Sequence, residues 1–282
     1  MKSKLQIALI VGLATVLFAC SASAQRTVAG RTEADGLKND RALSCEQNGR
    51  NGGDGQRYCE MKEQSLPTSG GLIKVDGKRN GGVSVKGWDR NEILVRAQIS
   101  AQAPTEDEAR ALVSEVRVLT GGANIYADGP ETRDKRWWAV SFEIFVPRQS
   151  DLSLKAHNGG ISIDSVRGTI EFETQNGGAS LRDLNGKVKG RTSNGGLSVK
   201  LSGNRWEGEG LDVETRNGGV QLLIPENYSA HLETGTVNGG VNFGFPLTVQ
   251  GKIEKNISTD LGSGGATVRL MTTNGGVSVK KL

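Results

Sequence analysis

The sequence from residue 158 to residue 200 reads NGGISIDSVRGTIEFETQNGGASLRDLNGKVKGRTSNGGLSVK, and the tripeptide Asn-Gly-Gly returns in it every 18 residues. Gly168 and Gly186 each follow the asparagine of a tripeptide by ten residues, so each unit carries a second turn signal. Self-similarity at a fixed period is the signature of a repeat architecture. The tripeptide also occurs outside this stretch, and the structural turns that it predicts begin at Asn80, Asn158, Asn176, Asn194, Asn217, Asn238 and Asn274.

Apolar and polar residues alternate after each of these turns. Ile161 and Ile163 follow the first tripeptide of the quoted stretch, and Leu197 and Val199 follow the third. A threonine two residues before the asparagine, such as Thr174, shares the parity of the apolar residues. Period two over many short segments predicts β-strands with one buried face and one solvated face.

Two all-β architectures accommodate this pattern. In a repeat β-solenoid, similar to a parallel β-helix, each unit forms one coil and the asparagines stack at one corner. In an antiparallel β-sandwich or meander, Asn-Gly would form a hairpin turn instead. The near-constant period favours the solenoid. We expect the asparagines and glycines to supply left-handed or positive φ at the corner, and the longer units to extrude turns around Gly203–Gly210 and Pro225–Tyr228.

The chain outside the regular repeats divides into further parts. Residues 25–65 have little apolar periodicity and predict a tail, whereas residues 66–282 form the predicted β-strand-repeat domain. Within that domain, Thr105–Glu108 reads as a capping box and predicts one short inserted α-helix. The clean alternation from Trp138 to Val146 predicts a long strand.

Composition excludes several classes of protein. The 282 residues include 40 Gly but only 6 Pro, without a G-X-Y period, which excludes collagen. Hydrophobic residues at 35%, with Gly added, fall in the globular range and exclude a disordered chain. The net charge is +4 and both signs are interspersed, so no basic stripe predicts nucleic-acid binding.

Residues 1–24 have the pattern of a signal peptide. Lys2 and Lys4 precede an apolar run over 5–19, and the small residues SASA precede Gln25. The run is too short for a membrane span, so the mature chain is expected to have none and to reside in the periplasm or cell envelope. The alternative is a lipid anchor at Cys20, because the segment LFAC approximates a lipoprotein signal.

The remaining cysteines form an even pair. Cys45 and Cys59 flank a polar, Gly-rich segment that closes easily, and an oxidising compartment favours a disulfide. A closed loop of this length stabilises the fold by roughly 3 kcal/mol in the chain-entropy model. We therefore predict a structural Cys45–Cys59 disulfide and a disulfide-tied N-terminal tail.

Several of these segments resemble a known family. The segments NGGVSVKGWDR, TEDEARALV and WAVSFEIFVP, the recurring T-x-NGG and the late LGSGG are similar to bacterial exported β-strand-repeat proteins described as putative adhesins. That family is a domain of unknown function, and the resemblance covers roughly residues 66–282. It implies a surface interaction role and supplies no catalytic residues.

Motifs for chemistry are missing from the sequence. No Gly-rich loop continues as G-K-[ST], the Gly-Asp segments fail the calcium-repeat pattern, and His157 and His231 have no ligand or triad spacing, so we predict no cofactor, no metal and no catalytic residue. The alternative is an enzyme that cleaves a cell-envelope polysaccharide, because parallel β-helices host such enzymes and need paired carboxylates. Its candidate outward acids are Asp164, Glu171, Glu173, Asp183, Asp212 and Glu214.

Two tryptophans are candidate binding anchors. Trp206 lies in a Gly-rich extruded turn, and Trp137 has the opposite parity to the apolar residues of its strand. Exposed aromatic side chains serve as anchors for partners. The alternative for Trp206 is packing over the end of a coil. The sequence thus predicts an exported, non-catalytic envelope or surface interaction protein, whose partner is an envelope glycan or a surface protein. A third class of function is purely architectural, in which the coil ends of neighbouring molecules stack into larger assemblies. The charged C-terminal residues Lys280 and Lys281 disfavour it.

Overall fold

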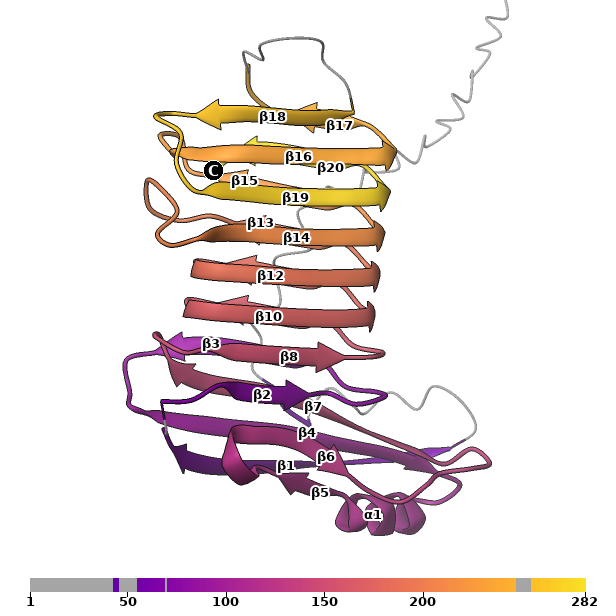
Figure 1. The fold of residues 1–282 in the computed structure, drawn as a ribbon. Coiled ribbons are helices and arrows are strands. Elements are labelled where there is room, and N and C mark those ends of the chain that lie inside the picture. The colour runs from indigo at the N-terminus through magenta and orange to yellow at the C-terminus, as the bar shows by residue number, and fades with distance from the viewer. Residues whose placement is uncertain (1–42, 46–54, 69, 247–254) are drawn as a thin grey trace, which may run out of the picture. The chain divides into compact units, whose positions relative to one another are not determined.

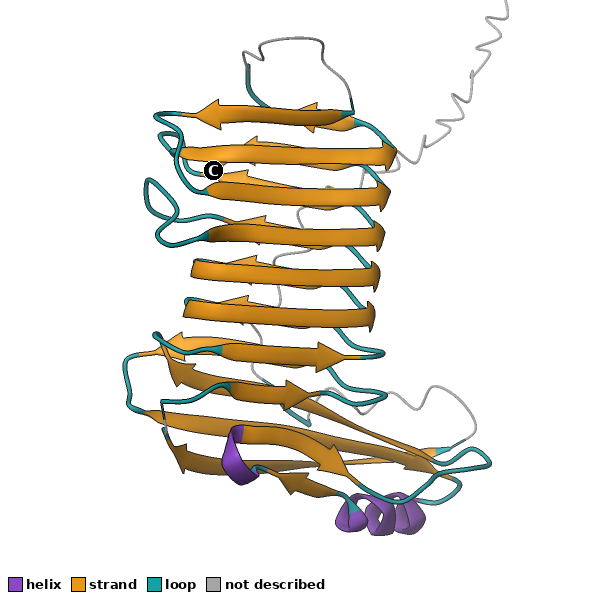
Figure 2. Cartoon of the chain, in the orientation of Figure 1, coloured by secondary structure: helices purple, strands orange, loops and turns teal. Residues whose placement is uncertain are grey.

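The computed structural model describes residues 43–45, 55–68, 70–246 and 255–282, which all lie in one compact unit that spans residues 36–282. Two ten-stranded sheets build this unit, and one α-helix lies near its N-terminal strands (Figures 1 and 2). The predicted signal peptide, residues 1–24, and Cys20 lie outside the described residues.

Sheet A contains the short strand of each repeat. Its strands, in spatial order, are β1 (Gln56–Pro67), β4 (Glu92–Ala103), β7 (Trp137–Pro147), β3 (Val83–Trp88), β9 (Ile161–Asp164), β11 (Ala179–Arg182), β13 (Leu197–Lys200), β15 (Val220–Ile224), β20 (Val277–Lys281) and β17 (Val241–Phe243).

Sheet B contains the longer strand of each repeat. Its strands, in spatial order, are β18 (Asn256–Leu261), β16 (Ala230–Asn238), β19 (Thr267–Asn274), β14 (Gly210–Asn217), β12 (Asn185–Asn194), β10 (Arg167–Asn176), β8 (Leu152–Ala156), β2 (Ile73–Asp76), β6 (Asn124–Asp128) and β5 (Arg117–Leu119).

Equivalent residues of successive repeats are paired in register. Asn176 pairs with Asn194 on β10 and β12, and Ala179 pairs with Leu197 on β11 and β13, both in parallel ladders. The antiparallel alternative therefore does not describe the repeats. Antiparallel pairs join only β1 to β4, β4 to β7, β5 to β6, and β16 to β18 among the named strands. Below, a sheet B strand and the sheet A strand that comes directly after it in the chain are together called a rung, as in β10–β11.

The core lies between the two sheets. Inward residues of sheet A, such as Ile163 and Leu181, face inward residues of sheet B, such as Ile170 and Leu211, and all are at most 2% exposed. On the repeat strands of sheet B, an inward-facing threonine is the last buried residue before the corner. Thr174 Oγ1, for example, donates a hydrogen bond to Gly159 O at 2.8 Å. A buried hydroxyl with this partner satisfies a carbonyl that the turn leaves free. Thr192, Thr215, Thr236 and Thr272 make the corresponding bond in other rungs.

The asparagines form a continuous amide ladder along one corner. Each Nδ2 donates to the Oδ1 of the asparagine in the next rung, with distances from 2.7 to 3.0 Å. The ladder satisfies both polar ends of every amide between its two terminal members, as in the Asn ladders of other β-rich assemblies. In spatial order it joins Asn80, Asn158, Asn176, Asn194, Asn217, Asn274 and Asn238.

The reason for glycine at this corner differs from the one expected. None of these asparagines and none of the glycines after them has a positive φ, so the prediction of left-handed geometry here is wrong. The first glycine is instead required by close approach: a Cβ on Gly177 would lie 2.2 Å from the Gly159 carbonyl oxygen of the next rung. Positive φ occurs at the second turn of the unit, at Gly168 (143°) and Gly186 (99°).

The spatial order of the rungs departs from chain order at both ends. Strand β3 lies between β7 and β9, and the last strand, β20, lies between β15 and β17. The first and last rungs of the chain are therefore each inserted one place in from an end of the stack, as the colours of Figure 1 show for the yellow β19. These are the two segments that share the sequence NGGVSVK.

The N-terminal part carries the disulfide and the helix. Cys45 and Cys59 are joined by a disulfide, as the sequence predicted. The predicted helix is α1 (Glu106–Glu115), and the Thr105 hydroxyl caps it by accepting from the Glu108 N–H at 3.3 Å. Residues 56–65 are not part of a tail, because they pair with β4 along the whole of β1. Their weak periodicity reflects the position of β1 as an edge strand with both faces partly exposed.

Candidate functional site

The outer face of sheet B carries ionic side chains in rows that run across the strands. Because the strands are in register, outward residues of neighbouring strands lie side by side. The first row is Ser153, Glu171, Lys189 and Asp212 on β8, β10, β12 and β14, and the second row is Lys155, Glu173, Arg191 and Glu214 on the same strands.

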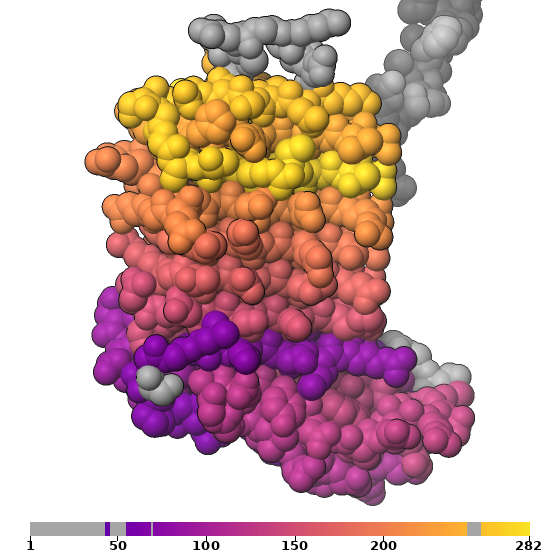
Figure 3. Space-filling model, viewed as in Figure 1, coloured from indigo at the N-terminus to yellow at the C-terminus, as the bar shows by residue number. Residues whose placement is uncertain are grey.

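The sign of the charge changes from strand to strand. Within the two rows, β10 contributes two acids, β12 contributes two bases, and β14 again contributes two acids. Neighbouring strands lie about 4.8 Å apart, so the stripes of opposite sign have that spacing. All six of these side chains belong to exposed residues, and this face is in view in Figure 3.

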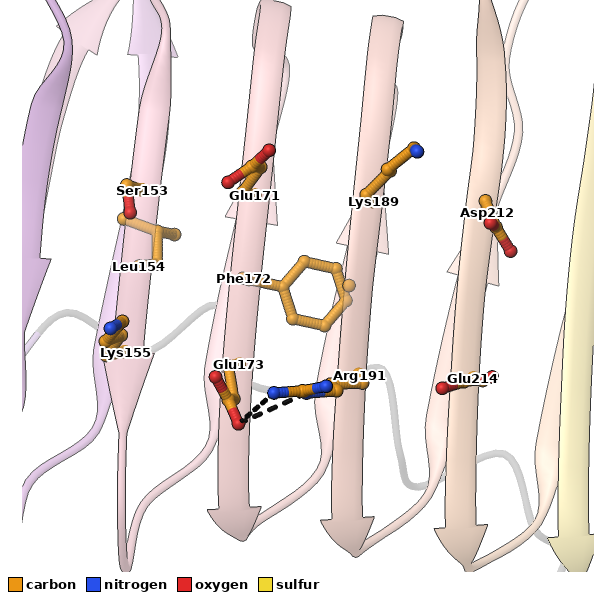
Figure 4. Close-up of a pocket in the computed structure, with 11 residues that line it drawn as sticks. Ser153, Leu154, Lys155, Glu171, Phe172, Glu173, Lys189, Arg191, Asp212 and Glu214 are labelled. Atoms are coloured by element: carbon orange, nitrogen blue, oxygen red, sulfur yellow. Dashed lines mark hydrogen bonds and ion pairs between the residues drawn. The ribbon is translucent and has the colours of Figure 1, made fainter.

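A shallow trough runs between the two rows. It has a volume of about 370 Å³ and is lined by both rows, and its floor is formed by Leu154, Phe172 and Gly190 (Figure 4). The Phe172 ring is buried and extends toward Gly190, where a Cβ would lie 2.0 Å from a ring carbon. Glycine at position 190 therefore lets a large ring fill the core beneath a flat floor.

Some of the charges in the rows compensate each other. Arg191 donates to Glu173 at 2.9 Å, and Arg269 on the neighbouring β19 lies 2.6 Å from Asp212. Glu171, Lys189 and Glu214, and Lys155 on β8, have no ion pair within 4 Å among the described residues. These four side chains of the two rows are free to take a charged partner.

A third basic residue, Lys187, extends the positive stripe of β12. Its ammonium group lies 2.7 Å from the Glu209 carboxylate, and this hydrogen bond, with the accompanying charge attraction, raises the pKa of Lys187. The raised pKa keeps Lys187 in its cationic form at neutral pH.

The candidate anchor Trp206 is not exposed. Its side chain is 4% exposed, and the indole N–H donates to Gly186 O at 2.9 Å. The turns that precede β14 and β16 also fold onto each other, because Arg205 and Ser229 form a parallel bridge. The prediction of an exposed anchor on an extruded turn was therefore wrong: the additional residues bring Trp206, and likewise Tyr228, into the core.

The second candidate anchor, Trp137, lies at the start of β7 and is half-buried. The guanidinium of Arg57 lies 5.7 Å from its ring centroid. Trp137 thus belongs to sheet A, whereas the trough lies on sheet B, and it already has a cationic partner of this chain over its ring. The structure does not bring the two tryptophans together.

The predicted outward acids fall into two groups. Glu171, Glu173, Asp212 and Glu214 gather on the trough. Asp164 ends β9 of sheet A, where it pairs with Arg182 at 3.3 Å, and Asp183 follows β11 of the same sheet. The sequence predicted which acids are outward but not that four of them share one depression, because that depends on the register of strands 18 or more residues apart.

The structure also assembles a hydrogen-bonded chain that sequence spacing missed. His231 Nδ1 lies 2.7 Å from Asp260 Oδ1, and Ser258 Oγ lies 3.1 Å from His231 Nε2. An Asp-His-Ser chain of this kind can activate a serine hydroxyl when backbone donors also stabilise the oxyanion. This chain lies on the face of the edge pair β16 and β18, with the Asp260 side chain 65% exposed, so water rather than a closed pocket surrounds it.

Among the described residues, no group of three or more His, Cys, Asp or Glu side chains has the arrangement to hold a metal ion. None of the helices in the described part of the chain combines the length and the apolar character needed to cross a membrane.

Comparisons with solved structures find relatives at low identity. A putative cell adhesion protein from Clostridium sporogenes is 11% identical, over 80% of this chain and 100% of that chain, with a TM-score of 0.46. A putative adhesin from Bacteroides fragilis is 10% identical over 79% and 97% of the two chains, with a TM-score of 0.34. A putative lipid binding protein from Parabacteroides distasonis is 8% identical over 79% and 96%, with a TM-score of 0.36.

No curated protein matches the sequence. The profile of the Toastrack DUF4097 family matches residues 114–280, more than half of the 282 residues, and so covers every rung from β6–β7 to the C-terminal one. The chain therefore belongs to the Toastrack DUF4097 family.

Proposed function

We propose that the protein is an exported, non-catalytic envelope or surface interaction protein, and that it binds its partner through the trough on the outer face of sheet B. The observation that carries this proposal is the set of exposed, alternating charges on β10, β12 and β14 around a flat floor. Three of these charges lack an ion pair in the described structure, so a partner of opposite sign can pair with them without breaking an ion pair of this chain.

Export is supported by two features of the chain. The N-terminal pattern of residues 1–24 is that of a signal peptide, and the Cys45–Cys59 disulfide suits an oxidising compartment. We propose that the mature chain begins at Gln25 and resides in the periplasm or cell envelope. Mass spectrometry of the exported protein tests this: a lipid on Cys20 would instead place the protein on a membrane surface.

The repeat geometry supports the proposed role. We infer that the Asn-Gly-Gly units are the coils of a β-solenoid, with one rung in each coil. Such a stack of equivalent rungs presents outward side chains at fixed intervals on a rigid support, which reduces the ordering cost of binding a long partner.

A binding assay with purified envelope tests the proposed function. The exported protein is mixed with the envelope fraction of its own cells, and the bound fraction is measured after sedimentation. Lys189→Gln with Arg191→Gln should reduce binding several-fold, because it removes the positive stripe. Lys200→Gln with Lys280→Gln, which removes two exposed charges from the outer face of sheet A, is the matched control and should bind like wild type.

Two results would contradict the proposed function. Equal loss of binding in both double variants would indicate a response to net charge and not to the trough. Release of sugar fragments from envelope polysaccharide by the wild-type protein, abolished by Glu171→Gln or Asp212→Asn, would favour the polysaccharide-cleaving alternative.

A further inference from the structure

The trough has the dimensions and charge order of one class of ligand. We propose that it binds an extended linear glycan that is zwitterionic, with carboxylate and amino groups on alternate sugars; this inference rests on the proposed function above. The glycan runs along the stack, across strands β8, β10, β12 and β14. Its carboxylates lie over Lys189, and its amino groups lie over Glu171 and Glu214.

The alternation of charge selects against ligands of a single sign. A polyanion would gain contacts with β12 but would meet two acids on β10 and two more on β14. A polycation would meet the basic stripe of β12, which Lys187 reinforces. Like charges brought together cost free energy, so only a partner that alternates in sign complements three successive stripes.

The spacing of the stripes selects against a peptide. Strands of a sheet are about 4.8 Å apart, whereas same-face side chains of an extended peptide are about 6.6 to 6.8 Å apart. A peptide whose same-face side chains alternate in charge would therefore fall out of register with the charged stripes within two such side chains. One sugar of an extended β-linked glycan is about as long as the strand spacing, so its charged groups stay in register with β10, β12 and β14.

The width and floor of the trough also suit a sugar chain. The two rows are separated by two residues along each strand, about 6.6 to 6.8 Å, which is near the width of a pyranose ring. The residues between the two rows, such as Phe172 and Gly190, face the core, so only backbone lies between the rows on the outer face and a ring can lie close to it. Because the trough lacks an exposed aromatic ring among its lining residues, binding depends on charge and should weaken as salt rises.

The probe for this inference is N-deacetylated hyaluronan, in which glucuronate alternates with glucosamine. Its binding to the exported protein is measured by isothermal titration at low and high salt, beside hyaluronan, chitosan and dextran. We expect the zwitterionic polymer to bind at least ten-fold more tightly than the other three and to lose most of its affinity at high salt. Equal binding of hyaluronan or of chitosan would overturn the alternating-charge assignment.

Charge reversals on the trough give the second arm of the test. Lys189→Glu and Glu171→Lys should each weaken binding of the zwitterionic polymer at least ten-fold, whereas Lys200→Glu on sheet A should leave it unchanged. Circular dichroism confirms that each variant keeps its strands, because all three positions are exposed. Unchanged binding in both trough variants would overturn the inference.

Two further outcomes separate this inference from the proposed function. If no soluble glycan binds but retention on envelope still requires Lys189 and Arg191, the ligand class is wrong and the proposed function stands. If sedimentation shows a dimer of the wild-type chain that Lys189→Glu abolishes, the trough is an interface between two copies, and both proposals fall.

Discussion

The first glycine of the Asn-Gly-Gly tripeptide should be far less replaceable than the second, although both stand in the same turn. A Cβ on Gly177 would lie 2.2 Å from the carbonyl oxygen of Gly159 and 2.4 Å from its carbon, whereas carbon atoms in contact are about 3.5 to 4.0 Å apart. A Cβ on Gly178 would meet one atom at 3.0 Å and its next neighbours at 3.7 and 3.9 Å. Neither glycine has a positive φ, so the comparison isolates close approach from backbone strain.

The cost of Gly177→Ala follows from what holds the two rungs together at this corner. The rungs must separate by about 1 Å, which strains the packing at a cost of about 1 to 3 kcal/mol. The separation also stretches two hydrogen bonds of 2.8 Å, one between the side-chain amides of Asn176 and Asn158 and one from the Thr174 hydroxyl to Gly159 O. Each contributes about 0.5 to 1.5 kcal/mol to the free energy of unfolding. The free energy of unfolding should therefore fall by about 2 to 6 kcal/mol.

Gly178→Ala should stay within about 1 kcal/mol of wild type, because the small clash is offset by the lower entropy of the unfolded chain. Thermal unfolding followed by circular dichroism measures both variants, and Gly177→Ala should lower Tm by roughly 5 to 20 °C. Gly275→Ala and Gly276→Ala repeat the comparison in another rung, with nearest atoms at 2.1 and 3.6 Å. Equal Tm values within each pair would refute the close-approach reasoning.

Three further predictions follow from buried or hydrogen-bonded side chains. Trp206→Ala should reduce the free energy of unfolding by about 3 to 5 kcal/mol, as expected for a buried indole; a variant that keeps wild-type stability would show that Trp206 is exposed in solution. Burial raises the pKa of Tyr228, so its proton is lost more readily in the unfolded chain, and stability should fall as pH rises above about 10; Tyr228→Phe should flatten that part of the pH profile, and an unchanged slope would contradict the assignment. The exposed Asp260-His231-Ser258 chain should give no hydrolysis of an activated ester above that of a Ser258→Ala variant, because water surrounds it; ester turnover that the substitution abolishes would make this a catalytic site.

The local structural features of this fold could be predicted from the sequence, because each unit repeats the same local pattern. The period of two placed Ile161 and Ile163 in the core, the capping box located α1, and the even pair of cysteines located the disulfide. The conformation of the corner was predicted incorrectly, because a glycine required by a positive φ and a glycine required by close approach look alike in a sequence. Only the neighbouring rung distinguishes them.

Features that depend on register between distant segments could not be predicted. Trp206 interrupts the period and was expected outside, yet its indole packs into the core and finds a carbonyl partner, Gly186 O, twenty residues away. The pairing of His231 with Asp260 and Ser258 arises from an antiparallel edge that no repeat predicts. The trough is an intermediate case, since the outward acids were visible but their alternation with bases across β10, β12 and β14 appears only when the register is known.

The order of the rungs bears on whether the stack can grow. A parallel stack of identical units leaves an open strand edge at each end, and such edges promote association. Here both termini of the repeat region are placed inside the stack, and the outer rungs are covered by strands that run against the repeat: β4 and β5 at one end, and β18 over β16 at the other. Among the described strands the sheet edges are β1, β5, β17 and β18: β5 and β17 are three residues long, β18 runs antiparallel to the repeat, and β1 carries charged residues along its length. A further rung would find a parallel partner only along the three residues of β17, so these edges oppose growth of the stack by added rungs.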